Sequence, residues 1–123
     1  MMIDLHRDAI AGGDGGYLKT ACEINGKTAA QALVVIGTDR GGLPHADWQT
    51  NLALGLKVQK KLCEMYPGLP RPLHLRTERF NGHVSGGALL LEIGSCGNTM
   101  EEALYTAELV GNAISALLLE SAA

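Results

Sequence analysis

Apolar residues either alternate with polar residues or form short continuous runs in several parts of the chain, a pattern typical of β-strands. Residues 1–6 predict a short strand. Residues 72–76 predict another, because Leu73 and Leu75 alternate with polar residues. Residues 88–93 form an almost wholly apolar run, which predicts a strand that is covered on both faces of a sheet.

A β-hairpin is the clearest local prediction. Asn25 and Gly26 separate two strand-like segments, residues 19–24 and 27–37. This dipeptide suits a type I′ turn, because both central residues of such a turn need a positive φ. The second arm contains the apolar run 32–36.

Two amphipathic helices are predicted. The first covers about residues 47–65, and its apolar face comprises Trp48, Leu52, Leu56, Cys63 and Tyr66. The second starts after Asn98 as N-cap, with Glu101 placed for a capping box, and runs to about residue 119. Its apolar stripe comprises Met100, Ala103, Leu104, Ala107, Val110, Ile114, Leu117 and Leu118. Together the elements predict an α/β fold, a mainly parallel sheet flanked by helices with a β-hairpin.

Composition excludes several classes of protein. The 123 residues suffice for one domain or a large part of one, and the net charge of −3 comes without the basic stripe of a nucleic-acid binder. No apolar run reaches the roughly 20 residues of a membrane span, and the start lacks the pattern of a signal peptide, so an export signal of an exported parent would lie upstream. The chain has three cysteines, Cys22, Cys63 and Cys96. Because their number is odd and no pair has CxxC spacing, we expect small, buried or partly buried thiols.

Glu92 is the most informative single residue, because it interrupts an apolar strand near its carboxyl end. An ionised carboxylate in such a place is costly without a partner, and ligands of α/β sheets gather at the carboxyl ends of strands. One interpretation is a catalytic carboxylate or a metal ligand. The other is a structural ion pair with an arginine such as Arg76 or Arg79.

The four histidines show no HxxxH or HExxH spacing. His6 closes a predicted strand and shares strand parity with Asp4, so it is either a zinc ligand oriented by a carboxylate or a structural histidine. His74 is expected to be solvated, and His45 to help shape the start of a helix. His83 lies in a polar loop, from which it could reach a cleft or serve only as a loop residue.

Several stretches, in this order, resemble the stage II sporulation protein P family. The most informative are Ile-Asp-Leu-His-Arg-Asp-Ala at 3–9 and Gly-Ala-Leu-Leu-Leu-Glu-Ile-Gly-Ser at 87–95. The others are residues 35–39, 42–48, 59–62, 65–69, 71–72 and 97–99.

The resemblance implies the fold of zinc-dependent N-acetylmuramoyl-L-alanine amidases, which cut the amide between N-acetylmuramic acid and the first alanine of the stem peptide. The family uses His, Glu and His as zinc ligands and a separate catalytic Glu. His6 matches a zinc ligand and Glu92 matches the catalytic residue. Residues 1–123 would then be the C-terminal part of the catalytic domain.

The same resemblance places the other two ligands in segments that precede His6, where this chain has no room for them. We therefore expect an incomplete site that binds zinc weakly and is weakly active or inactive in isolation. We further expect Arg79, Asn81, His83 and Ser85 to form a wall of the substrate-binding site. Asp4 and Asp8 are expected to be outer carboxylates, which support the metal ligand and do not bind the metal themselves.

The expected partners are peptidoglycan and, as the resemblance implies, a sporulation lytic transglycosylase and membrane-anchored engulfment proteins, outside the cytoplasm. A strand edge left exposed would permit a homodimer. The alternative function is a non-catalytic module that keeps the fold and binds peptidoglycan or takes part in assembly.

Overall fold

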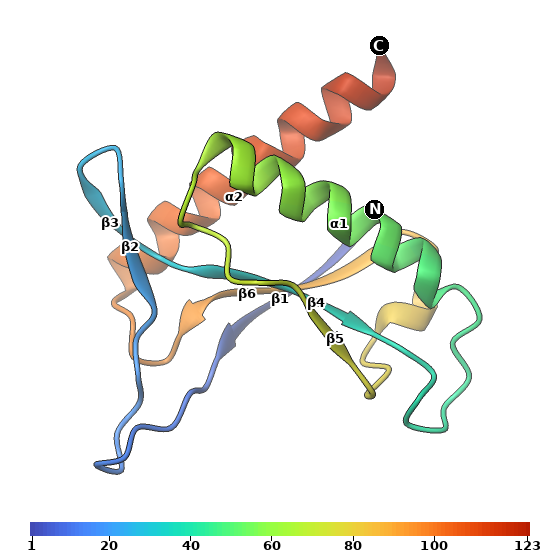
Figure 1. Ribbon diagram of the computed structural model, residues 1–123, viewed down its shortest axis with the longest axis horizontal. Helices are drawn as coiled ribbons and strands as arrows, with labels where there is room; N and C mark the ends of the chain where they lie inside the picture. The colour runs from blue at the N-terminus through green and yellow to red at the C-terminus, as the bar shows by residue number, and fades with distance from the viewer.

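The computed structural model describes all residues, 1–123, and shows an α/β fold in two layers (Figure 1). The α/β class is therefore confirmed. The elements are β1 (Met2–Asp8), β2 (Ala21–Ile24), β3 (Lys27–Ala30), β4 (Ala32–Gly37), α1 (Trp48–Met65), β5 (His74–Arg76), the 3-10 turn η1 (Gly82–Val84), β6 (Ala88–Ser95) and α2 (Met100–Ala122).

The main sheet has the strand order β1-β6-β4-β5 and is mixed. The pairs β1–β6 and β4–β5 are parallel, but β4 and β6, which join them, are antiparallel. The expectation of a mainly parallel sheet is thus not confirmed. The physical reason lies in residues 77–87, which connect β5 to β6. A parallel strand would require a crossover, usually through an α-helix, but this segment has no α-helix and the chain reverses its direction before β6.

Both helices pack on one face of the sheet, so the sheet is not flanked by helices on two sides (Figure 1). Alternate residues of the two central strands, such as Val34 and Leu91, form the main core with Val58, Leu62 and Val110 of the helices. The residues of opposite parity form a second, small cluster on the helix-free face: Leu33, Val35 and Leu90. All three are buried although no helix covers them.

The hairpin is confirmed, with one correction. Asn25 has a φ of 52° and Gly26 a φ of 75°, as a type I′ turn requires. The second arm is not one strand, because Gln31 separates β3, which pairs with β2, from β4, which enters the main sheet. The hairpin therefore projects from the sheet (Figure 1).

The predicted apolar face of α1 is correct for Leu52 and Tyr66, which pack against the core, and wrong for Leu56 and Cys63, which are exposed. The helix buries Asn51, Gly55, Val58 and Leu62, whereas Leu56 is 52% exposed. Gly55 faces the sheet, and a Cβ there would lie 2.9 Å from Cδ1 of Ile36. A residue without a side chain lets the helix approach the sheet closely, and hydrophobic periodicity cannot reveal this.

The N-cap of α2 is Thr99 and not Asn98, and the capping box is completed by Glu102 and not Glu101. Asn98 is buried and donates to the Thr20 carbonyl and to Glu102. Within the predicted stripe Ala103 and Val110 are buried, but Met100 and Leu104 are 61% and 63% exposed. Neither helix has the length and apolar character that crossing a membrane requires.

All three cysteines are free thiols. Cys22 is partly buried, as predicted, but Cys63 and Cys96 are exposed, so the prediction of buried or partly buried thiols is wrong for these two. Cys63 lies on the outer face of α1 because the helix buries Val58 and Leu62, as described above.

Candidate functional site

The polar side chains singled out in the sequence meet on the helix-free face of the sheet. His6 of β1 and Glu92 of β6 are register partners in neighbouring parallel strands. Register partners point to the same face and their backbones lie about 4.8 Å apart. Residues of the opposite parity, such as Leu5 and Ile93, line a groove with α2 on the other face. The imidazole and the carboxylate therefore belong to one surface.

Glu92 lies in an inner strand, between β1 and β4, and is partly buried. Its Oε2 atom is buried without a hydrogen-bond partner. Burial raises the pKa of this carboxyl above its ordinary value, and the negative charge of Asp8 raises it further, while His6 and Arg71 oppose the shift. A carboxylate with a raised pKa is a better base than an ordinary one, which suits proton transfer.

The alternative interpretation, an arginine ion pair, does not describe Glu92. Arg76 pairs with Glu78, with 3.4 Å between Nε and Oε2, and Arg79 donates to the carbonyl of Pro44 at 3.1 Å. No arginine forms a salt bridge with Glu92. The partly buried carboxylate is thus left with an unpaired oxygen.

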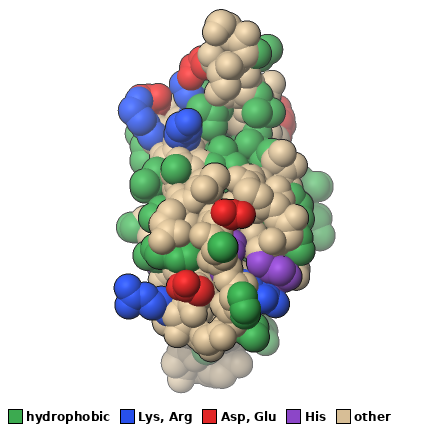
Figure 2. All heavy atoms as spheres, turned by 90° about the vertical axis from the view of Figure 1, so that its right-hand side faces the viewer, with side chains coloured by type: hydrophobic (Ala, Val, Ile, Leu, Met, Phe, Trp, Pro, Cys, Tyr) green, Lys and Arg blue, Asp and Glu red, His purple; other side chains and the backbone are tan.

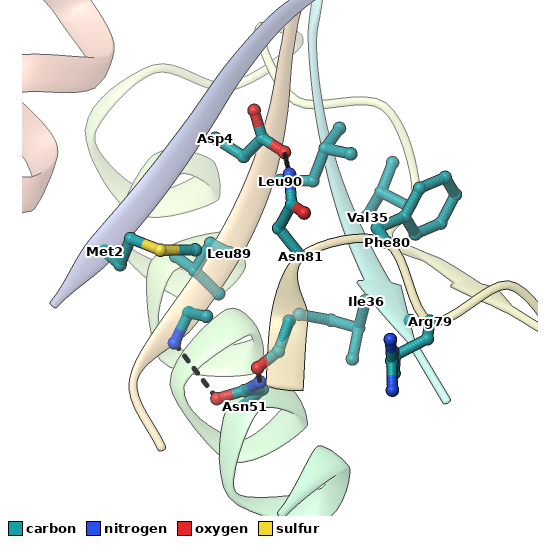
Figure 3. A pocket seen from close by; sticks show the side chains of 13 residues that line it. Met2, Asp4, Val35, Ile36, Asn51, Arg79, Phe80, Asn81, Leu89 and Leu90 are labelled. Carbon is teal, nitrogen blue, oxygen red and sulfur yellow. Dashed lines mark hydrogen bonds between the residues drawn. The ribbon is translucent and has the colours of Figure 1, made fainter. Parts of the chain in front are cut away.

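His6 is held by Asp4, with 2.8 Å between Nε2 and Oδ1. The second oxygen of Asp4 accepts a hydrogen bond from Asn81 at 2.9 Å, which joins β1 to the loop before β6 (Figure 3). The hydrogen bond from Asn81 lowers the pKa of Asp4, and His6 lowers it further. Asp4 is therefore a charged group that orients the imidazole.

Asp8, the second outer carboxylate predicted, has a different partner. The register of β1 with β6 shifts between His6 and Asp8. The carboxylate forms an ion pair with Arg71, with 3.1 Å between Oδ2 and Nη1. Asp8 thus acts on Glu92 through its charge and does not hold His6.

The donor atoms on this face do not make a complete zinc site. A catalytic zinc ion usually has three protein ligands. No group of three or more His, Cys, Asp or Glu side chains converges anywhere in the chain. His6 and Asp4 are bonded to each other, and Glu92 stands beside them as a single carboxylate. These residues alone do not fit a zinc centre.

The loop of residues 77–87 lies directly on the end of β4. A Cβ at Gly37 would lie 2.4 Å from the carbonyl oxygen of Arg79, so only glycine allows this approach. Phe80 has a φ of 53°, an unfavourable conformation for a bulky residue. The chain turns there, and the Phe80 ring lies near Val35 (Figure 3). Asn51 fixes the loop from below by donating to the Gly82 carbonyl.

The structure separates the four residues predicted as a substrate wall. Asn81 reaches the site through Asp4, whereas Arg79 points to Pro44. His83 is exposed in η1, and the Ser85 hydroxyl accepts a hydrogen bond from the Gly87 amide. Of the four side chains, only Asn81 forms a hydrogen bond with a residue of the His6–Glu92 surface.

A groove of about 280 Å³ on the helix-free face was not predicted. Its floor is the small apolar cluster described above, and its lining comprises Asp8, Leu33, Val35, His74, Arg76, Phe80, Leu90 and Glu92. The alternation on β5 predicted that His74 and Arg76 share one face, but no sequence pattern indicated which strands lie beside β5. The groove extends from Glu92 across β4 to the edge strand β5.

His45 was expected to help shape the start of a helix, but the structure shows it buried and without any hydrogen bond to α1. It is 3% exposed, and neither ring nitrogen has a hydrogen-bond partner. A Cβ at Gly82 would lie 2.9 Å from its Nε2, so the ring packs under η1. Burial lowers the pKa of His45, and the positive charges of His83 and Arg79 act in the same direction. Figure 2 shows this end of the molecule, where histidine and acidic side chains lie at the surface.

Comparisons with known proteins identify the family of this chain. No curated protein matches the chain, and no solved structure matches it either. The family model described as stage II sporulation protein P matches residues 1–115, which is nearly the whole chain. This protein therefore belongs to the stage II sporulation protein P family.

Proposed function

We propose that this protein is a peptidoglycan hydrolase of sporulation, and that its helix-free face serves cleavage of the amide between N-acetylmuramic acid and the L-alanine of the stem peptide. The family supports the sporulation role. The observation that carries the chemical proposal is the register pairing of His6 with Glu92, a carboxylate with a raised pKa and an unpaired oxygen.

Glu92 would act as general base and then as general acid. It takes a proton from a water molecule whose oxygen attacks the amide carbonyl carbon. As the carbon–nitrogen bond breaks, the same proton passes to the leaving nitrogen, so the products are a free carboxyl group and a free amine. Partial burial beside the apolar cluster of Leu33, Val35 and Leu90 supports the high proton affinity of Glu92.

Zinc is the cofactor that this function implies, and it activates water and polarises carbonyl groups when bound to such enzymes. His6, held by Asp4, would be the donor that this chain offers. Because no three donors converge, we propose that the chain by itself binds zinc weakly and cleaves its substrate only slowly.

The experiment is a release assay on purified sacculi with zinc present and long incubation. Mass spectrometry would detect stem peptides with a free N-terminal L-alanine. We expect slow release that falls by about 10²–10⁴-fold in Glu92→Gln, the range for loss of a general base. Glu108→Gln, on the exposed side of α2, is the matched control. Release at an unchanged rate in Glu92→Gln, or cleavage of another bond, would contradict the proposal.

A second candidate is a non-catalytic module that binds peptidoglycan or takes part in assembly. One observation favours it: β1 is an edge strand, and Leu5 on it is 64% exposed beside Leu104 of α2, which is 63% exposed. Exposed edges and apolar patches invite association. Binding to sacculi without any release of peptide would favour this function.

In either case we propose an extracytoplasmic place of action, because peptidoglycan lies outside the cytoplasmic membrane. A sporulation lytic transglycosylase and membrane-anchored engulfment proteins are the partners proposed from the family. A pull-down from sporulating cells with the Leu5 edge intact and with Leu5→Lys would test whether this edge serves them.

A further inference from the structure

We propose that the groove on the helix-free face binds a carboxylate of the substrate's peptide, and that Arg76 and His74 of β5 hold it. This inference rests on the proposed function, because it assigns the end of the groove that lies away from Glu92. The ligand class is an acidic peptide that extends from the amide to be cut.

The two ends of the groove carry different polar groups. Glu92 lines one end together with Asp8, whose charge is offset by Arg71, and His74 and Arg76 line the other end. A ligand that presents an amide to the carboxylates and an anion to the basic side chains matches this distribution. A neutral or cationic peptide does not.

The positions follow from strand register. Glu92 lies opposite Leu33 on β4, and Arg76 lies opposite Gly37, four residues further along the same strand. With about 3.3 Å per residue and about 4.8 Å between strands, the two backbones are roughly 16 Å apart, and the backbone of His74 is roughly 12 Å from Glu92. Side chains that lean into the groove shorten this gap. An extended peptide covers about 10 Å in three residues, so the carboxylate would lie two or three residues beyond the cleaved bond.

The walls suit such a ligand. Leu33, Val35 and Leu90 make an apolar floor between the charged ends, and Phe80 stands at the rim with 38% of its surface exposed. The volume of about 280 Å³ is close to the lower limit of roughly 300 Å³ for ligand pockets. Phe80 has a left-handed φ, which is strained for a bulky residue, and in this conformation its side chain lines the groove.

Arg76 is able to accept an anion. Its one ion pair, with Glu78, uses Nε at 3.4 Å, and both side chains are about half exposed, so the pair is weak. The two terminal nitrogens form no hydrogen bond within the protein and can bind a carboxylate in a bidentate manner. His74, which lies opposite Val35 at the floor of the groove, offers an additional ring nitrogen.

The test is a binding titration at low salt without zinc, in which NMR or calorimetry measures the binding. The probes are N-acetylmuramoyl-L-alanyl-D-glutamic acid and its uncharged diamide. We expect the acid to bind at least five-fold more tightly than the diamide, and Arg76→Gln to abolish this preference. Lys57→Gln, which removes an exposed cation of α1 in the helix layer, should keep it.

Glu78→Gln is the second variant, because it frees Arg76 without removing it. We expect this variant to bind the acid as tightly as the wild type or more tightly. Folding is checked by the NMR spectrum, since Arg76 is exposed and its side chain has a single partner.

Equal binding of acid and diamide, no binding of either, or an equal loss in Lys57→Gln would overturn the inference. The two proposals fail separately. A carboxylate preference that depends on Arg76, without any peptide release from sacculi, would leave the subsite and reject the amidase. Peptide release that is indifferent to Arg76 would leave the amidase and reject the subsite.

Discussion

Asp4 joins two parts of the site, because one of its oxygens holds His6 and the other holds Asn81 of the loop before β6. The imidazole is therefore positioned by the strand and by the loop together. Loosening either contact would leave His6 free to change its rotamer beside Glu92. This relationship makes the geometry of the site depend on a segment without regular strand or α-helix structure.

Zinc affinity should be low and should depend on His6. With one imidazole and no convergent set of three donors, we expect a dissociation constant above the micromolar range in calorimetric titrations. His6→Ala should remove the remaining heat of binding, while His83→Ala, an exposed histidine in η1, should not. Sub-micromolar binding by the wild-type chain would show that the donor set is complete after all.

Replacing Glu92 by Gln should stabilise the fold at neutral pH. The folded-state pKa of Glu92 is raised, so its contribution to stability is present at low pH and is lost as pH rises through that pKa. Ionisation of this partly buried carboxyl therefore costs stability as pH rises, and an amide avoids that cost. We expect Glu92→Gln to raise Tm by a few degrees at pH 7 and by less at pH 4. A lower Tm at pH 7 would mean that the carboxylate has a stabilising partner.

Glu102 should have the opposite dependence on pH. Hydrogen bonds from Lys19 and Asn98 lower its pKa to about 2, so the stability that it contributes is present above its ordinary pKa and is lost as pH falls toward 2. Glu102→Ala also removes half of the capping box of α2. We expect a loss of about 1–2 kcal/mol in urea unfolding at pH 7. Glu101→Ala, at the neighbouring exposed position, should cost much less.

His45 should make the fold sensitive to mild acid. Burial lowers its pKa, so its stabilising contribution is present above the unfolded-state pKa near 6.5 and is lost as pH falls. His83 and Arg79 add to this effect, whereas Asp47 and Asp39 oppose it. We expect the free energy of unfolding to fall between pH 7 and pH 5 in the wild type and to change less in His45→Phe. The same slope in both proteins would assign the sensitivity to other groups, and His74→Gln serves as control.

The edge strand β1 should support a homodimer. Leu5 and Leu104 form an exposed apolar strip beside the unpaired side of β1. Light scattering at increasing concentration should show a dimer, and Leu5→Lys should convert it to a monomer. Leu56→Lys, which places the same charge at a 52% exposed site on α1, should leave the dimer intact. A monomer at all concentrations would contradict this proposal.

Local sequence signals predicted the fold well wherever the conformational preference of a residue determines its own backbone conformation. Asn25 and Gly26 predicted the turn, and the apolar run before Glu92 predicted an inner strand. The predicted N-cap was wrong by one residue, because the buried Asn98 side chain is used by the Ser95 amide and the Thr20 carbonyl. The sequence does not contain information on such tertiary hydrogen bonds.

The candidate site was predicted in part for a similar reason. Strand parity and the family resemblance singled out His6 and Glu92, and β-sheet register brought them side by side. The burial of His45 could not be predicted, because it depends on the contact with Gly82, far along the chain. The groove could not be predicted either, because it depends on which strands are neighbours and on their directions.

The antiparallel junction between β4 and β6 has a consequence for selectivity. It puts the carboxylate and the guanidinium at diagonally opposite corners of one surface, so the surface has a defined polarity. A linear acidic chain lying in reverse would set its own negative charge against Glu92 and its neutral end against Arg76. Such an arrangement would reject the reversed orientation before any bond is broken, without a steric barrier.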